Sequence, residues 1–314
     1  MIRVSNLTKR YGSFLAVDDI SFEVECGGVV GFLGPNGAGK TTTIRILACY
    51  MPATNGSAAI AGFDCFSQSM QVRRRIGYLP ESTPLYPEMR VREYLNYRGK
   101  LRGMSRGERE AAIRRVADRC WLGEFIDRPI GQLSKGMRQR AGLADAIMHD
   151  PEVLILDEPT IGLDPNQIRE TRGLIRNLGE HHTVLLCSHI LPEVEQVCSR
   201  TIIIALGQVV ATGSPQELRN RFGSQGRVVA ELRGPQPEVE AGARSLKGVR
   251  KVEASAGDGW VRLSIDAPPE VDVREELFRM TTAKGWALRE LRREGATLED
   301  FFVKVTAEQA TRKM

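Results

Sequence analysis

The stretch GPNGAGKTT, residues 34–42, decides the fold of the first part of the chain. It matches the pattern G-x-x-x-x-G-K-[ST], with an apolar run at 29–33 before it and a helical pattern after it. The glycines let backbone N–H groups turn toward phosphate oxygens, which side chains would block. Lys40 would bring a positive charge to the β and γ phosphates, and Thr41 would bring a hydroxyl to Mg²⁺. The stretch therefore predicts a phosphate-binding loop between a buried strand and a helix.

Short apolar runs of strand length recur along the first 220 or so residues, with helical patterns between most of them. The runs lie at 29–33, 76–79, 153–156, 184–187 and 202–205, and residues 2–4 and 20–24 instead alternate like strands of a sheet with one wet face. This alternation predicts an α/β domain, residues 1–221, with a largely parallel buried sheet covered by helices. From about residue 84 to 148 charged helical sequence such as EREAAIRRVADRC replaces the strand signals. We therefore expect a helical subdomain to be inserted there.

Two carboxylates end one of the buried strands, in VLILDEP at 153–159. Charges at the end of a buried strand need a partner. Asp157 is therefore expected to hold Mg²⁺, and Glu158 to polarise a water molecule toward a γ-phosphate. His189 follows another buried strand and should reach the same sheet edge, where α/β sheets bind ligands. The other histidines lack this context and are interpreted as surface or cap residues: His149, His181 and His182.

A second anion-binding helix start is predicted at LSKGMRQR, residues 133–140. Ser134 is typical of a helix N-cap, and Gly136 leaves the backbone of the first turn open. Free N–H groups and the helix dipole make such a start a ready site for an anion. Within one chain this site is redundant, because the phosphate-binding loop lies far upstream.

The sequence after FGSQG, a predicted linker at 222–226, is interpreted as a separate domain covering residues 227–314. Strand patterns at 227–232, 249–255, 260–265 and 286–291 alternate with helical patterns at 238–246 and 271–283. Thr297 and Asp300 resemble a capping box that opens a final helix. The order β-α-β-β-α-β-α predicts a small α+β domain of the ferredoxin-like type.

Composition narrows the classes of partner. The net charge of +5 is compatible with an acidic membrane surface or an anionic ligand, but it is too weak to argue for nucleic acid. The six cysteines are scattered without a CxxC pair, which argues against a zinc site or a disulfide framework. No apolar run approaches the ~20 residues that a membrane helix needs. Any action at a membrane is therefore expected to need a partner.

The motifs occur in an order that resembles the ATP-binding cassette of ABC transporters. GPNGAGKTT looks like the Walker A motif of that family, and VLILDEP looks like Walker B with the catalytic glutamate. LSKGMRQR is similar to the family signature, which usually reads LSGGQ. IGLDP at 161–165 looks like the D-loop, and Ser188 with His189 looks like the switch-histidine loop. The resemblance covers the first 220 or so residues and implies a P-loop NTPase fold.

The resemblance also implies an ATPase that uses ATP and Mg²⁺ and works as a head-to-tail pair of cassettes. Its catalytic residues would be Glu158 as general base, His189 and Glu81, and its Mg²⁺ ligands would be Thr41, Asp157 and Glu81. One copy would contact ATP through Tyr11, which would stack on adenine, and through Gly34, Pro35, Asn36, Gly37, Ala38, Gly39, Lys40, Thr41 and Thr42. The other copy would complete the site through Ser134 and Gly136, and Asp164 would couple the two sites.

Two motifs depart from the family pattern. Glu81 occupies the place of the Q-loop glutamine, and its carboxylate can still ligate Mg²⁺ or orient water while adding negative charge. In the signature, Lys135 replaces a glycine and Met137 replaces a glutamine. Lys135 either adds positive charge to the helix start or is a solvated surface group. Ser134 and Gly136 keep the features that an anion site needs.

The resemblance further implies a separate integral membrane permease as a partner, seated on grooves beside Glu81 and the helical subdomain. It places this chain at the cytoplasmic face of the membrane and implies no nucleic-acid partner. The finer resemblance is to single-cassette subunits of ABC-2 type, often exporters, and it rests on residues 76–95 and 297–306. Two alternatives are weighed: a soluble ABC ATPase acting on ribosomes or DNA, and a nucleotide-binding module without turnover. The single cassette argues against the first, and the presence of both Lys40 and Glu158 argues against the second.

Overall fold

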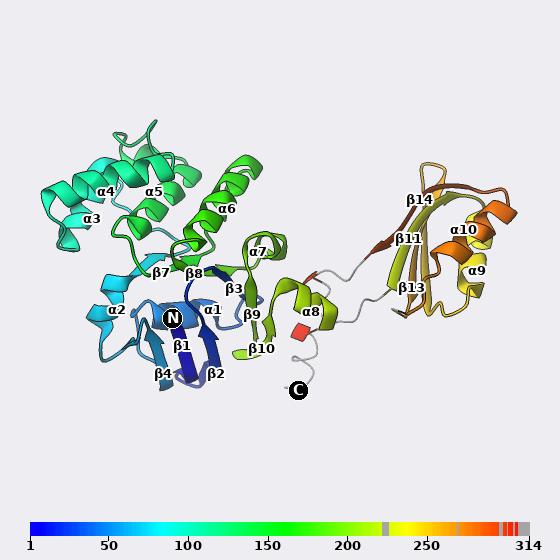
Figure 1. Ribbon diagram of the computed structural model, residues 1–314, viewed down its shortest axis with the longest axis horizontal. Helices are drawn as coiled ribbons and strands as arrows, with labels where there is room; N and C mark the ends of the chain where they lie inside the picture. Colours follow the sequence, from blue (N-terminus) through cyan, green and yellow to red (C-terminus); the bar gives the residue numbers. More distant parts are fainter. Residues whose placement is uncertain (222–225, 269, 295–297, 300, 304, 307–314) are drawn as a thin grey trace. The chain divides into compact units, whose positions relative to one another are not determined.

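The chain forms two compact units in the computed structural model (Figure 1). The structure describes residues 1–221, 226–268, 270–294, 298–299, 301–303 and 305–306. The first unit is Met1–Pro215 with Val305 and Thr306, and the second is Gln216–Lys304. The division therefore falls a few residues before the predicted boundary at 221, and the last described residues group with the first unit instead of the second.

The main sheet of the first unit has the strand order β10-β9-β3-β8-β7-β6. Its strands are β3 (Val29–Leu33), β6 (Ile76–Leu79), β7 (Val153–Asp157), β8 (Thr183–Ser188), β9 (Arg200–Ala205) and β10 (Gln208–Gly213). All neighbours pair in parallel except β10, which is an antiparallel edge strand. The strands β3, β7 and β8 are buried along their whole length, as expected for a parallel sheet covered on both faces. The predicted α/β sheet is confirmed.

A smaller antiparallel sheet packs against the same core. Its strands are β1 (Ile2–Tyr11), β2 (Phe14–Val24), β4 (Asn55–Ile60) and β5 (Phe63–Asp64), in the order β2-β1-β4-β5. Helix α1 (Lys40–Leu47) contacts β2 and β4 of this sheet and β7 of the main sheet, so it lies between the two. The rings of Phe22 and Phe32, one from each sheet, are 5.5 Å apart. The packing of α1 between the two sheets holds the helix in place at the end of β3.

The predicted helical subdomain lies between β6 and β7 in sequence (Figure 1). It contains α3 (Val91–Leu101), α4 (Arg106–Arg119), the short 3₁₀ helix η1 (Ile130–Gln132) and α5 (Lys135–Ile147). These α-helices pack on one another, and α5 also packs on β6. The first unit also contains α2 (Ser69–Arg75), α6 (Pro165–Gly179) and α7 (Leu191–Val197). Helix α8 (Pro215–Arg221) begins at the last residue of this segment and continues into the second unit.

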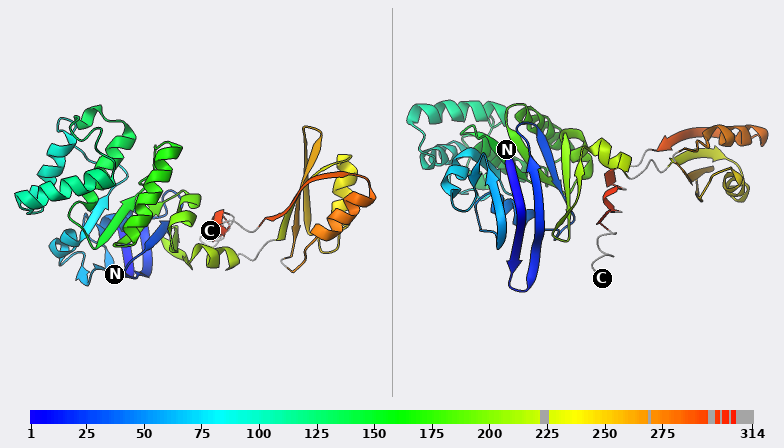
Figure 2. Two further views of the ribbon diagram at one scale, coloured as in Figure 1. Left: turned by 45° about the horizontal axis from the view of Figure 1, so that its top comes forward. Right: turned by 60° about the horizontal axis from the view of Figure 1, so that its bottom comes forward.

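The second unit has its own core. The elements are β11 (Gly226–Arg233), α9 (Gln236–Ser245), β12 (Lys251–Gly257), β13 (Trp260–Ala267), α10 (Arg274–Ala283) and β14 (Ala287–Glu294). The strands form one antiparallel sheet in the order β12-β13-β11-β14, and both helices lie on one face of it (Figure 2). The β-α-β-β-α-β order is the expected one, while the ferredoxin-like type stays a prediction. Residues 222–225 of the predicted linker and the capping pair Thr297 and Asp300 lie outside the described residues.

Among the described residues, no helix combines the length and the apolar character that crossing a membrane requires.

Candidate functional site

The carboxyl ends of four neighbouring parallel strands bring the predicted site residues to one sheet edge. Across these strands, the register pairs Leu79 with Leu156, Asp157 with Cys187, and Leu33 with Ser188. Each strand therefore stops at about the same height. The residues that follow at this edge are the phosphate-binding loop after β3, Glu158 after β7, His189 after β8 and the segment with Glu81 after β6.

The phosphate-binding loop can be built only with glycine at two of its positions. A Cβ atom on Gly39, whose φ is 103°, would lie 2.6 Å from the carbonyl oxygen of Ala16. A Cβ on Gly34 would overlap the backbone of Ile204. The loop is thus packed tightly against neighbouring backbone while its inner side is formed by main chain. Helix α1 begins directly after it, so the unpaired N–H groups of the first turn face the loop.

Lys40 folds its side chain back over this loop. Only 8% of Lys40 is exposed, and its Nζ donates hydrogen bonds to the carbonyl oxygens of Gly34 at 2.7 Å and Pro35 at 3.0 Å. The positive charge also lowers the pKa values of the carboxyls of Asp157 and Glu158, against the stronger effect of their burial. The loop therefore has the main-chain shape and the central charge that a phosphate group requires.

Both strand-end carboxylates are buried and carry raised pKa values. Asp157 is 3% exposed and Glu158 is 6% exposed. Burial is the largest cause of the raised pKa in each case, because it disfavours the charged form. A hydrogen bond from the Cys187 thiol opposes the rise at Asp157, and the Glu81 charge adds to it. Two carboxyls held so far from water are typical of a functional site.

Glu158 and His189 form a direct pair. His189 Nδ1 lies 2.8 Å from Glu158 Oε1, and the Ser188 hydroxyl donates to Glu158 Oε2 at 3.5 Å. Glu158 adopts a φ of 51°, in the left-handed region that a side chain disfavours. Its N–H is held by the carbonyl oxygen of Cys187 at 2.9 Å. Backbone strain of this kind is concentrated at active sites, where it aims a side chain.

A cavity of about 340 Å³ adjoins the carboxylate of Asp157. Thr41 and Glu81 also line it, so a hydroxyl and two carboxylates face one space. These are hard oxygen donors, and Mg²⁺ usually takes only one or two protein carboxylates and fills its remaining positions with water and phosphate oxygens. The donor set thus fits Mg²⁺ held together with a nucleotide.

Tyr11 lies at the exposed end of β1. Its hydroxyl donates to Met51 Sδ at 3.0 Å, and Lys9 Nζ lies 5.5 Å from the ring centroid. Met51 also lines the cavity of Thr41 and Asp157, so Tyr11 is one residue away from that cavity. With 45% of the residue exposed, the ring is accessible for stacking. The adenine contact itself stays a prediction.

The start of α5 lies beside the start of α6 and not at the cavity. Ser134 caps α5 by accepting a hydrogen bond from Met137 N–H at 3.2 Å. A Cβ on Gly136 would lie 2.5 Å from Gln167 Oε1, so this glycine packs closely against the side chain of Gln167 at the start of α6. Asp164 caps α6, accepting from the N–H groups of Asn166 and Gln167 at 3.0 Å each. Among the described residues that line the 340 Å³ cavity, none comes from these two helix starts.

Lys135, the departure from the family signature, packs along the D-loop of its own chain. A Cβ on Gly162, where φ is 74°, would lie 2.5 Å from Lys135 Nζ. Lys135 remains exposed, so its charge is available at the α5 start while its stem rests on a glycine. Lys135 therefore combines the two alternatives that the sequence left open: it is solvated, and it brings positive charge to the helix start.

Several contacts at the site are invisible to a reading of sequence patterns. Cys187 ends the predicted buried strand at 184–187, yet its thiol faces Asp157, and burial raises the thiol pKa so that it stays a donor. Its signal was its place opposite Asp157 in the neighbouring strand. The interpretation of His182 as a surface or cap residue is wrong: it is 5% exposed, with Nδ1 2.7 Å from the carbonyl oxygen of Pro151. The fold buries it beneath the loop before β7.

Similarity to known proteins decides the family. A family model described as ABC transporter matches residues 17–161. The linearmycin resistance ATP-binding protein LnrL of Bacillus subtilis (strain 168) is 32% identical over 309 residues, 98% of each chain. The chain belongs to the ATP-binding proteins of ABC transporters. The Nod factor export ATP-binding protein I of Burkholderia lata is a second relative of this ABC protein, 34% identical over 97% of this chain and 96% of that one.

The solved structures agree with the fold of this ABC protein. The dimeric structure of a bacterial ABC transporter cassette superposes with a TM-score of 0.62 at 25% identity, covering 68% of this chain and 98% of that chain. The predicted P-loop NTPase cassette is thus confirmed, and with it an ATP-binding subunit with ATPase activity. Because both full-length relatives align over nearly all of this chain, they extend through its second unit as well.

Proposed function

We propose that this ABC protein is the ATPase subunit of an ABC-2 type exporter and that two copies share each nucleotide between them. The observation that carries the proposal is the separation of the two anion-binding helix starts. The α1 start faces the Thr41, Glu81 and Asp157 side of the molecule, whereas the α5 start, at Gly136, lies against Gln167 at the start of α6. A γ-phosphate held at α1 would therefore reach the α5 start only from a second chain.

Two-fold pairing makes this arrangement self-complementary. If the α5 start of one copy faces the loop of its partner, the partner's α5 start faces the loop of the first. ATP offers a γ-phosphate to both helix starts, and ADP does not. ATP then stabilises the closed pair and hydrolysis releases it. The dimeric solved cassette supports this assembly.

The proposed division of labour follows the geometry of the sheet edge. Thr41, Asp157 and Glu81 would hold Mg²⁺, which neutralises charge on the phosphates when bound. Glu158 would take the proton from the attacking water, since its carboxylate is buried and aimed by the strained backbone. His189 would orient Glu158 through the 2.8 Å contact and face the γ-phosphate.

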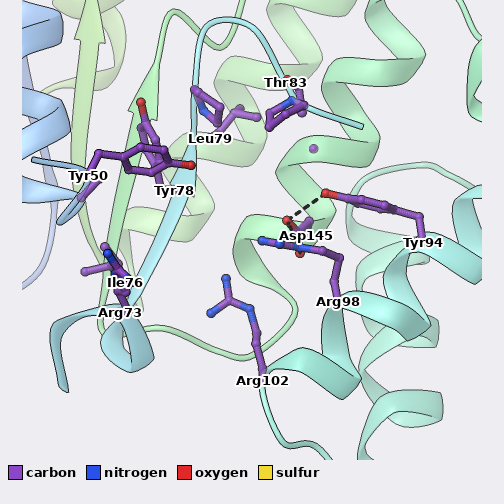
Figure 3. Close-up of a pocket in the computed structure, with 14 residues that line it drawn as sticks. Tyr50, Arg73, Ile76, Tyr78, Leu79, Thr83, Tyr94, Arg98, Arg102 and Asp145 are labelled. Atoms are coloured by element: carbon purple, nitrogen blue, oxygen red, sulfur yellow. Dashed lines mark hydrogen bonds and ion pairs between the residues drawn. The ribbon is translucent and has the colours of Figure 1, made fainter. Parts of the chain in front are cut away.

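The membrane side of the proposal rests on the relatives and on a groove. One relative is named for linearmycin resistance and the other for Nod factor export, which supports an exporter. The groove lies between β6, α3 and α5, where Tyr78, Thr83 and Tyr94 line it (Figure 3). We propose that a cytoplasmic segment of a separate membrane subunit docks there, which would hold this chain at the cytoplasmic face of the membrane.

The test is the oligomeric state of Glu158→Gln. Without its general base the variant should bind ATP and Mg²⁺ but not hydrolyse it, so a dimer should accumulate in size-exclusion chromatography with light scattering. The control Glu180→Gln, at an exposed position after α6, should stay monomeric with ADP and turn over ATP normally. A Glu158→Gln chain that binds ATP and remains monomeric would contradict the shared site.

A further inference from the structure

The groove beside the helical subdomain has a volume of about 480 Å³ and an uneven distribution of charge (Figure 3). Tyrosines form much of its wall: Tyr50, Tyr78 and Tyr94. Its charged lining residues are three arginines and one carboxylate: Arg73, Arg98, Arg102 and Asp145. Tyrosine and arginine are the residues enriched where protein interfaces bind most strongly.

The one carboxylate of the groove is already engaged. Asp145 is 7% exposed and accepts hydrogen bonds from Arg98 Nε at 3.0 and 2.9 Å. The hydroxyl of Tyr94 donates to the same carboxylate at 3.3 Å. Asp145 and Arg98 therefore neutralise each other, and the net charge of the groove comes from Arg73 and Arg102.

In the part of the chain that the structure describes, Arg102 forms no ion pair of 4.0 Å or less. Its Nη1 lies 2.9 Å from His149 Nε2, and its buried Nε has no hydrogen-bond partner. Burial lowers the pKa of His149 to about 3, so this imidazole is neutral and supplies no negative charge. Burial is also the largest cause of the lowered pKa of Arg102, and the Arg98 charge adds to it while Asp145 opposes it. Burying the Arg102 guanidinium without an ion-pair partner therefore destabilises the isolated chain.

Arg73 is the second arginine of the groove for which the structure shows no ion pair among the described residues. Its Nη2 donates to the carbonyl oxygen of Cys49 at 2.7 Å, which is a neutral acceptor. Within the described ranges, no ion pair of 4.0 Å or less involves Arg73 or Arg102. Both also line a neighbouring cavity of about 760 Å³, whose described lining has four arginines, with Arg74 and Arg115, and two carboxylates, Glu108 and Asp150. The lining of this neighbouring cavity therefore also carries an excess of positive charge.

We propose that the segment of the membrane subunit that docks in this groove inserts a carboxylate side chain between Arg102 and Arg73. The inference rests on the proposed function and names the chemistry of the partner. Docking would remove the remaining water from Arg102, and a neutral or basic segment would leave this charge buried without compensation. In Figure 3, the side chain of Arg102 points into the groove between Arg73 and the Arg98–Asp145 pair, which is where we place the carboxylate of the docked segment.

The groove is placed to influence the nucleotide side. Tyr50, Tyr78 and Pro80 line both this groove and the 340 Å³ cavity of Thr41 and Asp157. The rings of Tyr50 and Tyr78 are 5.7 Å apart in an edge arrangement and form a common wall. A carboxylate docked on one side of this wall would therefore change the packing of residues that face the Mg²⁺ ligands on the other.

The first experiment reverses the charge. The chain is co-expressed with the membrane subunit that the proposed function requires, and the two are co-purified in detergent. Arg102→Glu should reduce the retained membrane subunit at least tenfold. The control Arg114→Glu reverses an exposed arginine of α4 that does not line the groove, and it should retain the subunit as the wild type does. Single Asp→Lys or Glu→Lys changes in the cytoplasmic segments of the subunit should include one that restores binding to Arg102→Glu.

A second variant separates docking from folding. Arg102→Met removes the uncompensated charge and keeps the bulk, so the isolated chain should unfold at the same or a higher temperature while losing the membrane subunit. If Arg102 had only a structural role, Arg102→Met would lower both the unfolding temperature and the amount of membrane subunit retained. The inference is overturned if Arg102→Glu and Arg102→Met retain the subunit, if no acidic position rescues, or if both stability and binding fall in Arg102→Met. If the wild type itself retains no subunit, the proposed function fails, and this inference fails with it.

Discussion

The starts of α1 and α5 both offer unpaired N–H groups to an anion, but the chain equips them differently. At α1, Lys40 lies over the loop, Thr41 belongs to the first turn of the helix, and Asp157 and Glu158 come from the end of β7. At α5 the described surroundings are the cap Ser134, the tightly packed Gly136 and the exposed Lys135. The first start has the groups that chemistry on a phosphate requires, whereas the second can only bind one.

This difference teaches how a site can be divided between two copies of a chain. The chemical groups are concentrated where the sheet can bury them and hold them with strand register. The second start contributes binding that is available only when another chain approaches. Removing a group at α1 should therefore abolish chemistry, and changing α5 should abolish assembly.

The largest effect is expected for Lys40→Ala. This change removes the charge that the loop encloses, and loss of one preorganised donor at a phosphate costs up to about 10³-fold in rate. ATPase turnover of the purified chain is the measurement, with Lys100→Ala on α3 as an exposed control. A Lys40→Ala chain that keeps more than about a tenth of the wild-type rate would contradict the role of the loop.

Ser134→Arg should act on assembly while sparing the α1 start. We expect a loss of ATP-driven dimerisation and about a 10²-fold fall in turnover, with ATP still bound by the single chain. Light scattering and a fluorescent ATP analogue measure the two separately. Ser105→Arg is the matched control, because Ser105 caps α4 as Ser134 caps α5 and its loss costs a similar ~1 kcal/mol of helix stability. If both variants dimerise alike, α5 is an ordinary helix start.

His189→Gln should change the pH dependence of turnover. Burial raises the pKa of Glu158, and His189 lowers it in part. Removing the imidazole should raise this pKa further, so that less of the base is deprotonated at a given pH. The acid limb of the kcat profile should move to higher pH, with about a tenfold loss at neutral pH. An acid limb that stays in place or moves to lower pH would show that Glu158 does not act as the base.

The smallest effect is expected for Glu81→Gln. An amide oxygen can still face Mg²⁺, and the lost charge no longer raises the pKa of Asp157. We expect turnover within about threefold of the wild type, since one oxygen donor replaces another. Turnover is measured across an Mg²⁺ titration. An inactive variant that still binds ATP would show that the carboxylate itself is required.

The sequence predicted the parts that depend on local pattern. Uninterrupted apolar runs marked the buried parallel strands, and the glycine spacing of 34–42 marked the loop that only glycine can build. The strand-end rule then placed Glu158 and His189 at one edge, and the register brings them to 2.8 Å.

Contacts between distant segments could not be predicted in this way. The thiol of Cys187 faces Asp157 because two strands pair in one register, which no single pattern encodes. The stem of Lys135 reaches Gly162 only after α5 and α6 have packed. His182 has a polar side chain next to a strand, and its burial depends on the loop that covers it.

The most direct test of the shared site mixes two inactive chains, Lys40→Ala and Ser134→Arg. In a mixed pair, one site carries both defects, and the other combines the intact loop of one chain with the intact α5 start of its partner. The mixture should regain up to about a quarter of the wild-type ATPase rate, because half of randomly formed pairs are mixed and each has one intact site. A mixture no more active than the two variants apart would contradict the central claim.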